Sequence, residues 1–189
     1  YANVEELWYD IYPFGDYNKQ QPVPRVKYFF TPNTEAAKLK LITTGHNWSS
    51  NANDTYNTGN AAEFYEATHN ININGVKEYD QHLWRTCNPN PAGCQPQAGT
   101  WTYNRSGWCP GSIAMVWDFD LTKHIAEGYA DLFYEFDPTY FDECHPNHPN
   151  CVDGFTCTRC DAPDNPVLRV SGKVVSLSNQ VNILTEVAT

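Results

Sequence analysis

The chain has 189 residues and a mass of 21.5 kDa, which is long enough for a domain with a sizeable hydrophobic core. Its 12 Lys and Arg residues against 22 Asp and Glu residues give a net charge of -10, which argues against nucleic acid or an anionic membrane surface as a partner. Aromatic residues make up 14% of the chain, which excludes general disorder, and no apolar run reaches the roughly 18 residues of a membrane span.

Apolar side chains recur with a period of two along most of the chain, which predicts β-strands rather than helices. In residues 37–44, for example, Leu39 and Leu41 share one face and two lysines share the other. Asn-Gly at 74–75 stands between two alternating runs and predicts a tight hairpin, because both residues tolerate positive φ. Strands are predicted at 23–30, 37–44, 69–73, 76–79, 82–86, 100–104, 112–119, 129–136, 167–177 and 180–187, with one short helical stretch at 122–128.

Three stretches lack this alternation. Residues 1–24 are aromatic but irregular and are interpreted as an N-terminal extension or linker that packs on a neighbouring domain. Residues 44–60 and 137–166 have the composition of loops, and the second, rich in Pro and Cys, is long enough to need cross-links or a function. The pattern predicts an all-β sandwich over residues 25–189 with a Cys-rich loop insert at 137–166.

Cysteine content and sequons point to an oxidising, extracellular compartment. The chain has 7 cysteines and one methionine, and Asn47, Asn53 and Asn104 each begin an N-x-S/T sequon, which makes them candidate glycosylation sites. The first residue is Tyr1 and no signal peptide is visible, so the chain is interpreted as a mature product, a processed fragment or an excised domain. We therefore expect a secreted, extracellular protein.

Several motifs carry a resemblance to a known family. They are TGHNW at 44–48, AAEF at 61–64, His69, Asn-Gly at 74–75, the tryptophan-rich and glycine-punctuated block GTWTYNRSGWCPG at 99–111, and WDFDLT at 117–122. These motifs resemble the second domain of the peptide-N-glycosidase F family over residues 25–137, with weaker similarity at 167–177.

The resemblance implies both a fold and an activity. It implies an antiparallel jelly roll of eight strands, and an enzyme in which two jelly rolls enclose the active site and cleave the amide bond between an asparagine and the first sugar of an N-glycan. No metal or organic cofactor is implied. By resemblance, Glu63 matches a glutamate that holds sugar and water, Arg105 an arginine that contacts the substrate, and Trp48 a tryptophan that lines the sugar site.

Two departures from the family pattern qualify the activity. The principal catalytic aspartate of the family lies in the first jelly roll, and no residue of this chain takes its role. The family flanks its glutamate with two cysteines, whereas this chain has Ala61 and Tyr65. We therefore expect the chain to be inactive without an upstream catalytic jelly roll or a neighbouring chain that supplies one.

Two other interpretations remain open. The chain could be a non-catalytic glycan-binding or structural module of an extracellular assembly, in which the apolar tail at 181–187 adds a strand to a neighbour. It could also be a copper-dependent oxygenase-like domain that binds metal through His46 and His69, although one histidine per segment is more typical of structural residues.

The cysteines divide into two groups. The resemblance pairs Cys87 with Cys109 and leaves Cys94 without a family partner. In the insert, four cysteines and two histidines could bind zinc, but disulfides are preferred because the rest of the chain has the features of a secreted protein. The four insert cysteines are Cys144, Cys151, Cys157 and Cys160. Together with Cys94 they are five, so they cannot all pair within the chain.

Overall fold

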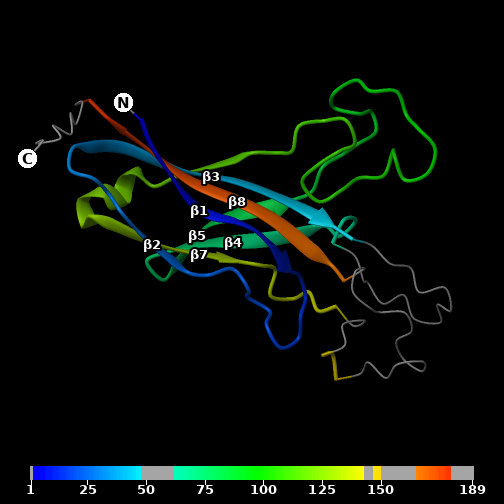
Figure 1. Ribbon diagram of the computed structural model, residues 1–189, viewed down its shortest axis with the longest axis horizontal. Coiled ribbons are helices and arrows are strands. Elements are labelled where there is room, and N and C mark those ends of the chain that lie inside the picture. The colour runs from blue at the N-terminus through cyan, green and yellow to red at the C-terminus, as the bar shows by residue number, and fades with distance from the viewer. Residues whose placement is uncertain (1, 48–61, 143–146, 150–164, 180–189) are drawn as a thin grey trace, which may run out of the picture.

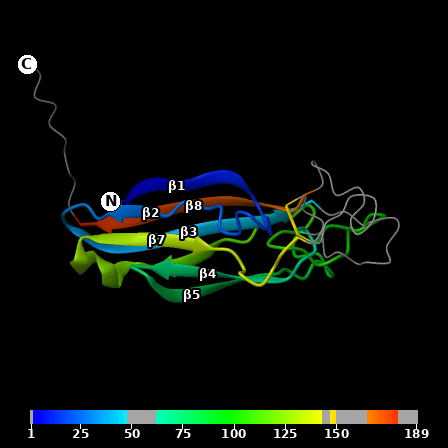
Figure 2. The ribbon, with the colours of Figure 1, turned by 90° about the horizontal axis from the view of Figure 1, so that it is seen from below.

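The computed structural model describes residues 2–47, 62–142, 147–149 and 165–179 (Figure 1). Its strands form two four-stranded sheets that pack face to face (Figure 2), which confirms the predicted all-β sandwich. The strands are β1 (Ala2–Pro13), β2 (Val26–Phe29), β3 (Thr34–His46), β4 (Ala67–Ile73), β5 (Val76–Leu83), β6 (Trp117–Asp120), β7 (Tyr129–Glu135) and β8 (Val167–Ser178). A short 3-10 helix, η1 (Thr122–Glu127), connects β6 to β7.

The strand order is that of a jelly roll. One sheet has the order β1-β8-β3-β6 and the other β2-β7-β4-β5, with all described neighbours antiparallel. The pairs β1 with β8, β2 with β7, β3 with β6 and β4 with β5 are those of one long hairpin wound into a sandwich. This winding brings the connections after β1, β3, β5 and β7 to one end of the molecule, the right-hand end in Figure 1.

The core lies between the sheets and follows the predicted alternation. On β3, Leu39, Leu41 and Thr43 are buried, and the residues between them face outward. They meet fully buried side chains of the opposite sheet such as Ile71 and Leu132. Each such side chain contributes about 1.5–3 kcal/mol by leaving water, so the alternation fixes which face of each strand turns inward.

Strand β1 differs from the sequence-based expectation of an irregular segment. Residues 2–13 pair with β8 along the edge of the first sheet, with a register shift between Glu6 and Trp8. Trp8 is 1% exposed, and its Nε1 donates a hydrogen bond to the carbonyl of Pro24 at 2.9 Å. The shift interrupts the alternation, and for this reason the pattern alone did not indicate a strand.

Several other predicted elements differ from the observed ones in where they begin or end, or in their type. Residues 100–104, predicted as a strand, form turns, and within 112–119 the strand begins only at Trp117. The two strands predicted at 76–79 and 82–86 are one strand, β5. The helical stretch predicted at 122–128 is η1, which ends at Gly128 in a left-handed conformation with φ of 78°. The strand predicted at 180–187 and most of the Cys-rich insert lie outside the described residues.

Candidate functional site

Two glycines allow three segments to meet at the loop end of the sandwich, which is the end where the connections after β1, β3, β5 and β7 lie. A Cβ on Gly45, near the end of β3, would lie 2.0 Å from the carbonyl oxygen of Ala62. Gly107 has φ of +81°, and a Cβ there would lie 2.2 Å from the carbonyl oxygen of Thr43. The absence of a Cβ therefore lets the end of β3 contact both residues 62–65 and the 105–108 part of the β5–β6 connection.

Glu63 lies where these segments meet, and its backbone is fixed on both sides. The N–H groups of Ala62 and Glu63 donate to the carbonyl of Asn47 at 3.0 and 3.3 Å, and Ser106 N–H donates to the carbonyl of Glu63 at 3.0 Å. Asn47 directly follows β3 and has φ of 70°, which asparagine tolerates better than most residues. The position of Glu63 is thus set by main-chain bonds to both neighbouring segments.

Arg105 binds Glu63 from the interior. Its Nε donates to Oε1 of Glu63 at 2.8 Å, and its two terminal nitrogens donate to the carbonyl of Tyr103 and to Oγ1 of Thr100 at 2.9 and 3.0 Å. The Arg105 side chain is 4% exposed and that of Glu63 is 22% exposed. A buried guanidinium with three bonded partners holds the carboxylate in one orientation while part of the carboxylate remains accessible.

Aromatic rings support this ion pair. The guanidinium carbon of Arg105 lies 5.0 Å from the ring centroid of Phe64 and 4.9 Å from that of Trp108. His46 stacks on Trp108 with 5.6 Å between ring centroids and 24° between planes, and Trp108 Nε1 donates to the carbonyl of Gly45 at 2.9 Å. We call Glu63, Arg105, Trp108 and His46 the Glu63 cluster.

The surroundings of His46 favour its neutral form. Burial lowers its pKa from the usual value, the nearby Arg169 charge lowers it further, and Glu63 opposes both effects. Its Nε2 lies 2.8 Å from Oγ1 of Thr44, so the hydroxyl and the imidazole share a hydrogen bond. The Glu63 cluster therefore combines an ion pair with an imidazole whose surroundings favour the neutral form.

A disulfide and a backbone bridge hold the loop that carries Arg105. Cys87 and Cys109, the pair that the resemblance indicates, form a disulfide. The backbones of Arg85 and Arg105 exchange two hydrogen bonds of 2.8 and 3.1 Å, and Cys87 N–H donates to Oδ1 of Asn104 at 3.1 Å. These links fasten the 104–109 segment to the end of β5 without the flanking cysteines that the family resemblance leads one to expect.

Aromatic packing occupies the place of one of those cysteines. Tyr65 packs on Tyr140 with 4.4 Å between ring centroids, and Tyr140 stacks on Phe14 at 4.3 Å. The Ser106 hydroxyl donates to the carbonyl of Tyr65. This cluster joins the connections after β1, β3 and β7, so it supports the loop that presents Glu63.

Comparison with known proteins identifies the family. The family model for the C-terminal domain of peptide-N-glycosidase F matches residues 16–140 of the chain, which is most of its length. The chain belongs to this family. This chain is 35% identical to the peptide-N(4)-(N-acetyl-β-D-glucosaminyl)asparagine amidase F of Elizabethkingia miricola over 105 residues. These residues are 55% of this chain and 28% of that protein.

Solved structures of this peptide-N-glycosidase F family show the same fold. Recombinant peptide:N-glycanase F superposes with a TM-score of 0.71 at 22% identity, over 95% of this chain and 53% of that structure. PNGase F described as a glycosylasparaginase from Flavobacterium meningosepticum gives a TM-score of 0.71 at 23% identity with the same coverage. PNGF-II gives 0.56 at 19% identity, over 95% of this chain and 30% of that structure. The chain thus spans about half the length of the PNGase F structures.

The structure brings together some of the residues that the peptide-N-glycosidase F resemblance singles out. Glu63 and Arg105 are bonded, whereas Trp48, Asn53 and the four insert cysteines Cys144, Cys151, Cys157 and Cys160 lie outside the described residues. Asn47 Nδ2 donates to the carbonyl of Asn165 at 2.9 Å, and Asn104 accepts from Cys87, so both described sequon asparagines are engaged within the protein. Cys94 is half-buried and forms no disulfide with another described cysteine.

The two histidines of the copper interpretation lie in different surroundings. His69 is completely buried against Phe14 and Phe136, and its Nδ1 accepts a hydrogen bond from Asp137 N–H at 2.9 Å. Burial lowers the pKa of His69 to about 3, although the Asp137 charge opposes it. In the described part of the chain, no group of three or more His, Cys, Asp or Glu side chains is placed to bind a metal ion. No described helix is long and apolar enough to cross a membrane.

Sequence reasoning did not identify the stack of His46 on Trp108 or the hydrogen-bond acceptors around Arg105. Thr100 and Tyr103, which accept from the guanidinium, belong to a stretch whose alternation was interpreted as a strand. A signal was present, since an arginine flanked at short spacing by several aromatic residues and glycines is typical of a shaped loop rather than a strand.

Proposed function

We propose that this chain is the glycan-contacting half of a secreted peptide-N-glycosidase F-like amidase, which cleaves the bond between an N-glycan and its asparagine. The observation that carries the proposal is the Glu63 cluster, in which a partly exposed carboxylate is held by a buried arginine at a family motif. A carboxylate in this state accepts hydrogen bonds from sugar hydroxyls or from a water molecule.

Each residue of the cluster has a proposed role. Glu63 orients the first sugar and a water near the amide bond. Arg105 is 3% exposed, so we propose that it acts as a positioning residue: it orients Glu63 and does not itself contact the substrate. Trp108 and His46 keep the guanidinium in place, and Trp48 lines the sugar site as the family resemblance implies.

Amide hydrolysis by this chain requires a second catalytic group. We propose that a second jelly-roll domain, upstream in the same polypeptide or in a neighbouring chain, supplies the carboxylate that activates the nucleophile. The proposal is supported by the coverage of the PNGase F structures, of which this chain accounts for 53%. On this basis the chain alone binds glycan and does not hydrolyse it.

A non-catalytic glycan-binding module is the second candidate. It is favoured by the ion pair itself, because the Glu63 carboxylate is held by the buried Arg105 while its side chain stays 22% exposed, so it can accept hydrogen bonds from sugar hydroxyls. The two candidates differ only in whether a partner domain restores hydrolysis.

The test measures glycopeptide binding and hydrolysis with matched variants. Glu63→Gln is compared with Glu66→Gln, which removes an exposed carboxylate three positions away that pairs only with His82 among the described contacts. We expect Glu63→Gln to weaken binding of an asparagine-linked glycopeptide about tenfold, and Glu66→Gln to leave it unchanged, as measured by calorimetry. Equal binding by the two variants would refute the proposed site. Hydrolysis that appears only after addition of a second jelly-roll domain distinguishes the amidase from the binding module.

A further inference from the structure

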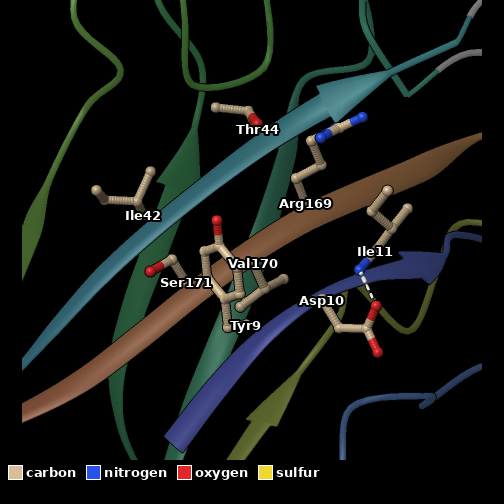
Figure 3. A pocket seen from close by; sticks show the side chains of 8 residues that line it. All are labelled: Tyr9, Asp10, Ile11, Ile42, Thr44, Arg169, Val170 and Ser171. Atoms are coloured by element: carbon tan, nitrogen blue, oxygen red, sulfur yellow. Dashed lines mark hydrogen bonds between the residues drawn. The ribbon is translucent and has the colours of Figure 1, made fainter. Parts of the chain in front are cut away.

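A hollow of about 320 Å³ lies on the outer face of the β1-β8-β3-β6 sheet (Figure 3). It is lined by side chains of the three strands β1, β8 and β3, chiefly Tyr9, Ile11, Ile42, Thr44, Arg169 and Ser171. The volume is within the range of pockets that hold small ligands. We call this hollow the outer-sheet groove.

The strand register explains why the sheet is hollow here. Tyr9, Ser171 and Ile42 form one row across β1, β8 and β3, and Ile11, Arg169 and Thr44 form the next row. In the first row a small serine stands between two large side chains, so the middle strand forms a floor and its neighbours form walls.

The lining has the chemistry of a sugar site. Tyr9 is 76% exposed and Ile11 is 47% exposed, so both present apolar surface to a ligand at the groove. An exposed tyrosine ring can pack on the apolar C–H face of a pyranose, while Arg169, Ser171 and Thr44 supply donors and acceptors for its hydroxyls. This mixture favours a carbohydrate over a purely apolar ligand.

The groove adjoins the Glu63 cluster through the contact between Thr44 and His46. The row beyond Thr44 and Arg169 contains His46, which shares a hydrogen bond of 2.8 Å with Thr44 and stacks on Trp108. Trp108 in turn contacts Arg105, which binds Glu63. Period-two spacing places Thr44 and His46 on the same outer face of β3, so a ligand at Glu63 can extend along this face.

We propose that the outer-sheet groove is a second sugar subsite, which holds the outer sugars of the same glycan whose first sugars lie at Glu63. The proposal rests on the proposed glycan-binding function. It predicts that longer glycans bind more tightly than the chitobiose core alone, because only the longer ones reach Tyr9 and Arg169.

The experiment compares two free sugars on the 189-residue chain. Chitobiose and a high-mannose oligosaccharide with a chitobiose core are titrated separately by calorimetry. We expect the oligosaccharide to bind about tenfold more tightly. Tyr9→Ala removes one wall of the groove, and Ser171→Trp fills its floor. Each variant should abolish the tighter binding of the oligosaccharide and leave chitobiose binding unchanged.

Phe29→Ala is the matched control, because Phe29 is an aromatic residue with 66% exposure on the outer face of the other sheet. It should leave both affinities unchanged, and the thermal unfolding of each variant checks that its fold is intact. The groove proposal would be overturned if the two sugars bound with equal affinity, or if the oligosaccharide still bound more tightly than chitobiose in Tyr9→Ala. The proposed function would stand in either case if chitobiose binding still required Glu63. Failure of both sugars to bind would overturn the proposed function together with the groove.

Discussion

The ion pair between Glu63 and Arg105 makes a quantitative prediction about stability. In Glu63→Leu the buried guanidinium loses its anionic partner but keeps its bonds to Tyr103 and Thr100. Removing one partner of a buried pair costs about 3–5 kcal/mol, and because Glu63 is 22% exposed we expect about 2–3 kcal/mol here. Glu63→Gln keeps an acceptor oxygen for Arg105 Nε, so it should cost less than about 1 kcal/mol.

The assay is urea unfolding followed by tryptophan fluorescence at constant pH. The double variant Glu63→Leu with Arg105→Met completes a cycle and should recover part of the loss, because it no longer buries an unpaired charge. If Glu63→Leu cost less than about 1 kcal/mol, or if the double variant recovered none of the loss, Arg105 would not be a buried charge that depends on Glu63, and the reasoning would be refuted.

Three further predictions address the fold. Gly45→Ala places a Cβ 2.0 Å from the Ala62 carbonyl oxygen, so it should lower the free energy of unfolding by about 2 kcal/mol or more and weaken glycan binding. The control Gly128→Asn lies in open space at the end of η1 and should be nearly neutral in the same urea assay. Because the folded-state pKa of His69 is about 3, below the unfolded value of about 6.5, its contribution is fully present above pH 6.5 and is lost as the pH falls toward 3, by about 2 kcal/mol at pH 5. His69→Gln should flatten this pH dependence of unfolding, and an unchanged slope would contradict the assignment. Trp8→Ala should cost about 3–5 kcal/mol in thermal unfolding, and a cost below about 1 kcal/mol would show that β1 is dispensable for the sandwich.

The loop end of the jelly roll explains why one domain can carry this site. The connections after β1, β3, β5 and β7 all leave at that end. The disulfide of Cys87 and Cys109 closes the connection after β5, and the aromatic cluster around Tyr140 joins the other three. Functional side chains commonly lie on loops that a rigid scaffold positions. The sheets thus supply the scaffold, and their outer face adds the groove next to the cluster.

The sequence by itself determined most of the strands other than β1, the side of each of these strands that is buried, and the family. Alternation is a local property, so Leu39 and Leu41 on β3 could be assigned to the core from their spacing alone. The family motifs located Glu63 and Arg105 and indicated the pairing of Cys87 with Cys109, because a motif preserves residue order without any knowledge of contacts.

The tertiary structure alone decided the features that depend on register and approach between distant segments. The bulge in β1 hid a strand whose pairing with β8 is not local, and the burial of Arg105 follows from the contact that Gly45 and Gly107 permit. The outer-sheet groove likewise requires Tyr9 and Ser171 to stand opposite each other across two strands that are far apart in the chain. Local patterns carry no information about such pairings, because the register is set only when the whole sandwich packs.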